Sequence, residues 1–161
     1  MISHPSYGFC LVKIGDWSVS GASYLEDYPL SLADALLLSA GKNICPDNEP
    51  PDDERFRPVI DCEGDYYTVE FRPGQEVLVW DGSPEDEEEP DYALLLDAGR
   101  LSELCHELAA DIKNDWLQWV LWEMDVADGI NDNPDMEADE LPEFEHREKV
   151  LEWICSLLEE V

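Results

Sequence analysis

Basic residues are scarce in this sequence. Only 9 Lys and Arg stand against 40 Asp and Glu in 161 residues, which gives a formal net charge of −31. Proteins that bind nucleic acid contact its phosphates through a Lys/Arg face, so we expect no direct nucleic acid binding. Anionic lipid headgroups would repel the same charge, so we expect no membrane partner either.

Long apolar runs are also missing. Stretches such as ALLL and WVLW are far shorter than the roughly 20 residues that a membrane-spanning helix needs. The first residues, MISHPSYGFCLVKI, lack the basic start and long apolar run of a secretory signal. The five cysteines show no CxxC spacing and are typical of reduced, partly buried thiols. Together these features favour a cytoplasmic protein.

Sequence motifs of catalysis are missing too. The chain has no GxSxG, HExxH, glycine-rich phosphate loop or paired zinc spacing. Cys105 and His106 are adjacent, but neighbours on a helix point about 100° apart and do not form a nucleophile–base pair without help. The sequence therefore predicts a protein that is not an enzyme and has no cofactor.

What the chain does contain is enough apolar material for a core. Apolar residues make up 44% of the sequence and six of them are Trp, which argues against disorder over the whole chain. A length of 161 residues favours a single domain, residues 1–161. Residues 1–80 have mainly strand patterns with one short helix, and residues 92–161 have mainly helical patterns. Two acidic loops, 81–91 and 125–142, interrupt this order.

The patterns predict an α+β fold, in which an antiparallel sheet of about five strands packs against about three helices. A hairpin over residues 7–24 should turn near Gly15 and Asp16. The stretches FRPVIDC, YYTVEF and EVLVW, rich in β-branched and aromatic residues, should supply three more strands. Helices are expected at 31–41, 101–124 and 143–160 from their apolar periodicity. Ser31 can cap the first of these helices, and Gly41 suits its C-terminal end.

The acidic residues are concentrated in the second half of the chain. Residues 1–80 hold 14 acids and 5 bases, whereas residues 81–161 hold 26 acids and 4 bases. A mobile, solvated loop is the ordinary interpretation of a run such as PEDEEEPD. The helical stretch from 101 to 124 is acidic as well, however, at Glu103, Glu107 and Asp111, so the charge should extend over ordered structure. So large a net charge destabilises a small domain by self-repulsion, which suggests that the acids serve a purpose.

Calcium binding is one alternative. In a Ca²⁺ loop that starts at Asn131, oxygen ligands would stand at the right first positions, but Met136 replaces the required Gly and Pro142 the required Glu. The calcium motif therefore fails and we predict no metal ligands. A loosely Ca-binding acidic protein stays open as an alternative function.

Trp116, Trp119 and Trp122 lie three residues apart and follow one stripe of a helix. Most such stripes belong to the core. The sharper prediction is that Trp122, beside Glu123 and Asp125, is an exposed anchor for a partner, since aromatic anchors ringed by polar residues carry much of the energy of protein interfaces.

In size, acidity, cysteine usage and mixed α/β pattern, the chain resembles the immunity proteins of bacterial toxin–immunity pairs. It also resembles the DNA-mimic inhibitors of restriction or CRISPR enzymes. The resemblance implies a bacterial, acidic protein that neutralises a basic protein partner, such as a toxin or nuclease domain. An immunity protein is the first expectation and a DNA mimic the alternative. The predicted partner-binding residues are Glu85, Asp86, Glu87, Glu88, Glu89, Asp91, Trp122, Glu123, Asp125, Asp128, Asp132, Asp135, Glu137, Asp139 and Glu140.

Overall fold

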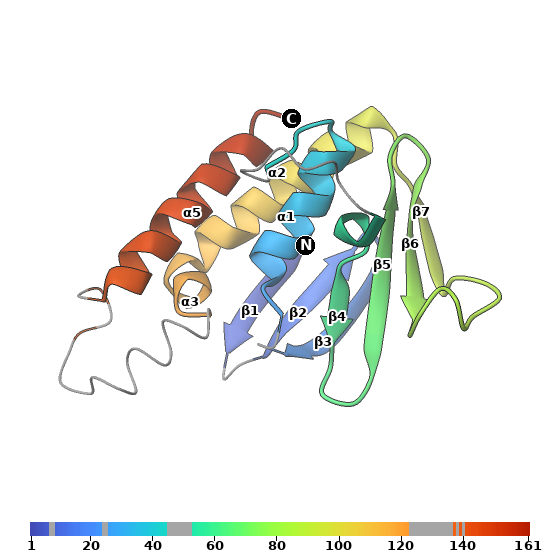
Figure 1. Ribbon diagram of the computed structural model, residues 1–161, viewed down its shortest axis with the longest axis horizontal. Helices are drawn as coiled ribbons and strands as arrows, with labels where there is room; N and C mark the ends of the chain where they lie inside the picture. The colour runs from blue at the N-terminus through green and yellow to red at the C-terminus, as the bar shows by residue number, and fades with distance from the viewer. Residues whose placement is uncertain (7–8, 24–25, 45–52, 123–136, 138, 140) are drawn as a thin grey trace.

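The computed structural model describes residues 1–6, 9–23, 26–44, 53–122, 137, 139 and 141–161. The chain is a single α+β domain, as the sequence predicts, with seven strands in two antiparallel sheets rather than about five strands in one. Figure 1 shows the helices gathered beside the two sheets.

The first sheet has the order β1-β2-β3 and is built from the N-terminal residues. Its strands are β1 (Ile2–Ser6), β2 (Phe9–Ile14) and β3 (Trp17–Ser23). Ile14 pairs with Trp17 across the turn, and Gly15 adopts a positive φ of 59° there, so the predicted hairpin is confirmed. Strand β1 was not predicted, because a short strand that contains Ser, His and Pro lacks the usual β-branched signature.

The second sheet has the order β4-β5-β6-β7. Its strands are β4 (Val59–Asp61), β5 (Tyr66–Arg72), β6 (Glu76–Asp81) and β7 (Tyr92–Leu95). The first three confirm the predicted strands, whereas β7 is a strand that was not predicted, at the start of the mainly helical residues 92–161. The two sheets meet where the Ser23 hydroxyl donates to Asp61 at 3.0 Å and where the rings of Trp17 and Tyr67 pack edge to face, 5.3 Å apart.

Five helical segments are described. They are α1 (Tyr28–Ser39), the 3₁₀ turn η1 (Asp53–Phe56), α2 (Ala98–Asn114), α3 (Trp116–Val120) and α5 (Pro142–Leu158). The last predicted helix is confirmed to within two residues at each end. The expected helix over 101–124 is instead two helices, separated at Asp115, whose backbone leaves the helical region at φ −114° and ψ 37°.

The first helix begins earlier than expected and has a different cap. The side chain of Asp27, not Ser31, accepts the backbone N–H of Leu30 at 3.4 Å, while the Ser31 hydroxyl is buried and has no partner among the described residues. The predicted stop at Gly41 is confirmed: the helix ends at Ser39 and Gly41 has a φ of 76°.

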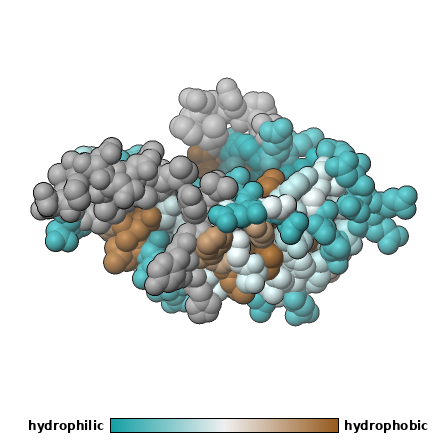
Figure 2. Space-filling view, turned by 90° about the horizontal axis from the view of Figure 1, so that it is seen from below, coloured by the Kyte–Doolittle hydropathy of each residue, from teal (hydrophilic) through white to brown (hydrophobic). Residues whose placement is uncertain are grey.

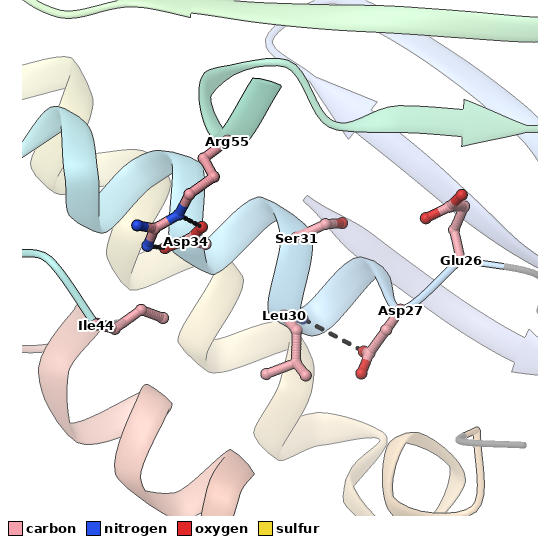
Figure 3. A pocket seen from close by; sticks show the side chains of 7 residues that line it. All are labelled: Glu26, Asp27, Leu30, Ser31, Asp34, Ile44 and Arg55. Atoms are coloured by element: carbon pink, nitrogen blue, oxygen red, sulfur yellow. Dashed lines mark hydrogen bonds and ion pairs between the residues drawn. The ribbon is translucent and has the colours of Figure 1, made fainter. Parts of the chain in front are cut away.

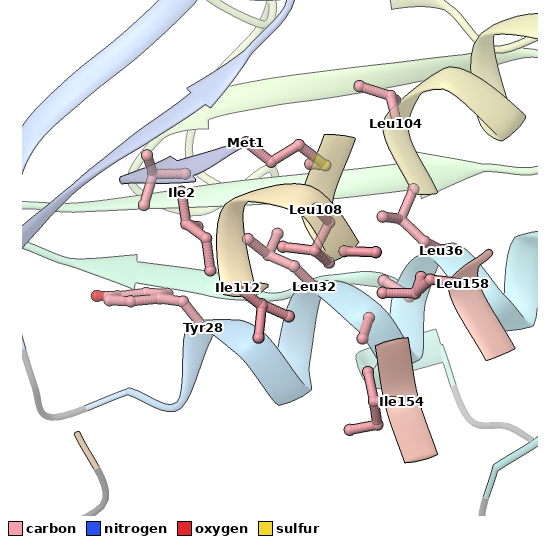
Figure 4. Packing of buried hydrophobic residues seen from close by; sticks show 14 of the residues in the cluster. Met1, Ile2, Tyr28, Leu32, Leu36, Leu104, Leu108, Ile112, Ile154 and Leu158 are labelled. Carbon is pink, nitrogen blue, oxygen red and sulfur yellow. The ribbon is translucent and has the colours of Figure 1, made fainter. Parts of the chain in front are cut away.

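Helix α1 lies at the centre of the core. It packs against α2, α5 and β5, and it is apolar on almost every side, as a helix buried among several neighbours must be. Figure 4 shows Leu32 and Leu36 among side chains from α2 and α5, including Leu108 and Ile154. The core therefore depends on the placement of α1 and on what holds its first turn.

Candidate functional site

The first acidic run forms an ordered loop between β6 and β7. Its predicted binding residues Glu85, Asp86, Glu87, Glu88, Glu89 and Asp91 are all exposed. Both ends of the loop are held by hydrogen bonds: Thr68 donates to the carbonyl of Gly82 at 2.7 Å, and the Asp91 carboxylate accepts the backbone N–H of Asp81 at 2.7 Å. The carboxylates of this loop are therefore attached to a fixed frame.

This loop projects from one end of the molecule. In Figure 1 it lies at the right-hand end of the longest axis, beyond β6 and β7. Figure 2 shows the same end as a hydrophilic surface, coloured teal.

The second acidic run is described only in part. Glu137 and Asp139 are exposed and precede α5 in the chain. Figure 1 places the start of α5 at the opposite end of the longest axis from the β6–β7 loop. The described parts of the two runs thus do not share one face. The predicted residues Glu123, Asp125, Asp128, Asp132, Asp135 and Glu140 lie outside the described residues.

Trp122 is buried, not exposed, so the expectation of an exposed anchor is wrong. Only 7% of its surface is accessible, and its indole N–H donates to the carbonyl of Glu26 at 3.0 Å. Its ring centroid lies 5.1 Å from that of Trp119 and 6.4 Å from that of Tyr28. Three aromatic side chains therefore cover one end of α1, and Trp122 is part of the core.

Most of the few basic side chains already have carboxylate partners within the molecule. Of the nine Lys and Arg, eight form ion pairs, and Lys13 is the one for which the described residues offer none. Several of these pairs join elements that are far apart in the sequence: Arg147 of α5 binds Asp27, and Lys42 binds Glu160. The positive charges are thus paired with carboxylates of the same molecule. The surplus charge at the surface is negative.

A groove runs along the outer side of α1. It consists of two hollows of about 420 and 480 Å³ that share Glu26 and Ser31 in their walls, and we call them together the α1 groove. The first hollow, shown in Figure 3, is also lined by Leu30, Asp34, Ile44 and Arg55. The second extends toward the acidic loop and is also lined by Glu54, Arg57, Val59, Thr68, Pro84 and Glu85.

Several charged groups in this groove neutralise one another. Arg55 donates two hydrogen bonds to Asp34, one of 2.7 Å, and Arg57 donates to Glu70 at 2.9 Å. Among the described residues, Glu26 and Glu54 line the groove without a cation partner, and Glu85 shares Arg57 with Glu70. Burial raises the pKa of Glu26 above its usual value of 4.5, and the charges of Asp61 and Asp27 raise it further. The groove is therefore electronegative and holds one partly desolvated carboxylate.

The adjacent Cys105 and His106 lie in different surroundings, one buried and one exposed. Cys105 is buried, and burial raises the pKa of its thiol to about 11. His106 is exposed and its Nε2 lies 3.3 Å from the carbonyl oxygen of Glu159, so the two neighbours do face different surroundings. Burial likewise raises the pKa of Cys10 to about 12.

Neither a metal cluster nor a membrane-spanning helix occurs in the described residues. These residues contain no group of three or more His, Cys, Asp and Glu side chains that could hold a metal ion. None of their helices combines the length and the apolar character that crossing a bilayer demands. Residues 131–136, the first half of the Ca²⁺ loop considered from the sequence, lie outside the described residues.

Sequence reasoning did not find the α1 groove. Glu26 is followed by Asp27 in the stretch YLEDYPL, and nothing in that stretch distinguishes it from the other 39 acids. Its environment arises only when β5, η1 and the β6–β7 loop come together beside α1. Of the predicted binding residues that the structure describes, Glu85 is the one that lines this groove.

Comparison with known proteins gives no match: no protein-family model fits the chain, and neither curated proteins nor solved structures resemble it significantly.

Proposed function

We propose that this protein binds a basic protein and neutralises it, as an immunity protein that inhibits a cognate bacterial toxin, such as a nuclease domain. The observation that supports the proposal is the combination of an anchored loop of exposed carboxylates with a set of bases that are almost all paired internally. A field of one sign around a folded body raises the rate of encounter with an oppositely charged partner by roughly 10–10³-fold.

The fold also favours binding over a merely solvated charge. The loop that carries Glu85 to Glu89 is fixed by backbone and side-chain hydrogen bonds at Asp81, Gly82 and Asp91. Fixed carboxylates lose little conformational entropy when a partner pairs with them, whereas a mobile tail loses much more. The frame therefore suits recognition of a particular cationic surface.

The test is a pull-down from the source organism with the tagged protein at low and at high salt. We expect one retained protein, or one with its close relatives, that has a high isoelectric point and is released by salt. Retention of no basic protein at low salt would overturn the proposal. Displacement of DNA from several unrelated basic proteins would point instead to DNA mimicry.

Association kinetics then test the role of the loop. Replacing Glu85, Glu87 and Glu89 by Gln removes three charges while keeping the size of each side chain. We expect slower association at low salt and little change in dissociation, because exposed charges act mainly on the rate of encounter. Replacing Glu143, Glu145 and Glu152 by Gln is the matched control, since these exposed carboxylates belong to α5 and not to the loop. An equal slowing by the two variants would contradict a specific role for the loop.

A further inference from the structure

We infer that the α1 groove is the point at which an arginine side chain of the basic partner inserts, with Glu26 as its main counter-ion. The inference rests on the proposed function and specifies where and how the partner is recognised. The shape of the groove is the first observation that supports it. The two hollows, about 420 and 480 Å³, meet at Glu26 and Ser31 and leave room for a long side chain and its neighbours.

The walls of the groove fit an arginine better than a small cation. Leu30 and Ile44 line one hollow, and Pro58, Val59 and Pro84 line the other. Such apolar surfaces accommodate the methylene stem of an arginine, and the weakly hydrated guanidinium can stack on them. A compact hydrated ion would find no such complement, and the described residues contain no metal-holding cluster.

The charge of the groove is complementary to one cation. Asp34 and Asp27 are each occupied by an arginine of this chain, and Arg57 is occupied by Glu70. Glu26 and Glu54 then line the second hollow without a described cation partner, and Glu85 lies near Arg57, whose charge is already paired with Glu70. An incoming guanidinium would meet a local excess of carboxylates that the fold itself does not satisfy.

Glu26 is the carboxylate for which a cation matters most. It is partly buried and lies near Asp61 and Asp27, which together with burial raise its pKa above the usual value. Burying a charged carboxylate without a partner is costly, and a cation that pairs with it removes much of that cost. Glu54 and Glu85 are exposed and remain hydrated, so each contributes less.

Ser31 offers a second acceptor next to Glu26. Its hydroxyl is buried and makes no hydrogen bond with the described residues, although it borders both hollows. In Figure 3 this side chain extends on the same side of α1 as Glu26. Once the Ser31 side chain rotates toward the hollow, one guanidinium with its five N–H donors can reach the carboxylate and the hydroxyl together, which an ammonium does less well.

The experiment uses the whole protein, labelled with ¹⁵N, and the peptide acetyl-Gly-Arg-Gly-amide as the probe. The matched probe carries citrulline, which keeps the shape of arginine and lacks its charge. We expect the arginine peptide to shift the amide signals of Ser31, Val59, Thr68 and Ser83, and the citrulline peptide to leave them in place. Shifts spread evenly over the acidic surface would overturn the inference.

Two variants of groove residues and one control variant test which side chains bind the arginine. Glu26→Gln should weaken binding of the arginine peptide by about fivefold, since it removes a partly desolvated ion pair. Glu152→Gln, an exposed carboxylate on α5, is the control and should change binding by less than about twofold. Ser31→Ala leaves the charge unchanged and should weaken binding by about twofold through the lost acceptor. Equal effects of Glu26→Gln and Glu152→Gln in a folded protein would contradict a role for the groove.

The same variants separate this inference from the proposed function. If the pull-down retains a basic protein that binds wild type, Glu26→Gln and Glu152→Gln equally well, the groove is not the docking point, although the neutralising function stands. If no basic protein is retained but the arginine peptide still binds at Ser31 and Thr68, the proposed function fails and the groove remains an arginine site.

Discussion

At the scale of single residues, Asp27 supports two elements at once. Its carboxylate caps α1 through the backbone N–H of Leu30 and accepts two hydrogen bonds, of 2.6 and 2.7 Å, from Arg147 of α5. Arg147 is only 1% exposed, so its charge depends on partners inside the protein. One side chain therefore fixes both the start of the central helix and the position of α5 against it.

Asp27→Asn tests this double role, because asparagine can still cap the helix but carries no charge. We expect a loss of about 3 kcal/mol in the free energy of unfolding, since the buried Arg147 loses a charged partner that accepts two of its hydrogen bonds. Asp97→Asn is the control: Asp97 caps α2 through the N–H of Arg100 at 2.8 Å and pairs with no buried cation. It should cost less than about 1 kcal/mol. Urea unfolding measures both, and similar losses would show that the pair with Arg147 adds little.

Glu70 gives a prediction about pH. Burial alone would raise the pKa of this carboxyl, but hydrogen bonds and charge from Arg57 and Arg72 outweigh it and bring the pKa below the usual 4.5. A carboxylate whose pKa is lowered by folding stabilises the protein above its unfolded pKa, and the contribution is lost as the pH falls through the folded pKa. Glu70→Gln should therefore destabilise the protein by about 2 kcal/mol at pH 7.

The difference between wild type and Glu70→Gln should shrink as the pH falls below about 4.5. Denaturant unfolding at a series of pH values measures this. A difference that stays constant from pH 7 to pH 3 would mean that Glu70 acts through packing alone.

Individual side-chain roles were the least predictable feature from the sequence. The stripe of Trp116, Trp119 and Trp122 was visible, but which of them is exposed depends on where Tyr28 and Glu26 lie, and that is set by tertiary contacts. Ser31 matched the cap pattern as well as Asp27 does. Asp27 rather than Ser31 caps α1 because its carboxylate also neutralises Arg147, which lies 120 residues further along the chain.

At the scale of secondary structure elements, the end of α1 depends on one backbone conformation. Gly41 has a φ of 76°, which side chains other than glycine rarely adopt, and nothing lies within 4 Å of an added Cβ. Gly41→Ala should therefore cost about 1 kcal/mol from backbone strain alone. Gly99→Ala, inside the first turn of α2, should be neutral or stabilising because alanine favours helix. Thermal unfolding of the two variants compares them, and an equal shift would contradict the assigned role of the αL conformation.

The predictability of the elements followed the strength of their local signals. Alternating apolar residues and the turn at Gly15 identified β2 and β3, and the periodicity of residues 143–160 identified α5. Strand β7, with the sequence YALL, was taken as part of the helical half because a short apolar run fits either structure. It becomes a strand because β6 offers it a free edge.

At the scale of the whole molecule, negative charges repel one another while the cations are already paired. Raising NaCl from about 0.01 M to about 1 M shortens the screening length from about 30 Å to about 3 Å. We expect the urea midpoint to rise with salt, because weakening the repulsion among the surplus carboxylates outweighs the weakening of the mostly exposed ion pairs that the eight paired basic side chains form.

A variant with Gln at Glu85, Glu87 and Glu89 is the control, and its midpoint should depend less on salt. A midpoint that falls as salt rises would mean that the internal ion pairs dominate the electrostatics. If the protein unfolds at low salt and is stable only in molar salt, its acidity is a halophilic adaptation.

The separation of the β6–β7 loop from the start of α5 bears on stoichiometry. An ordinary interface buries roughly 800 Å² on each side, a small part of the 8777 Å² of accessible surface. A partner seated on the loop thus leaves the far pole uncovered and open to a second copy. If light scattering finds one partner per chain, the partner docks at one pole only. If it finds two partners per chain, the molecule is a bivalent binder of cationic proteins.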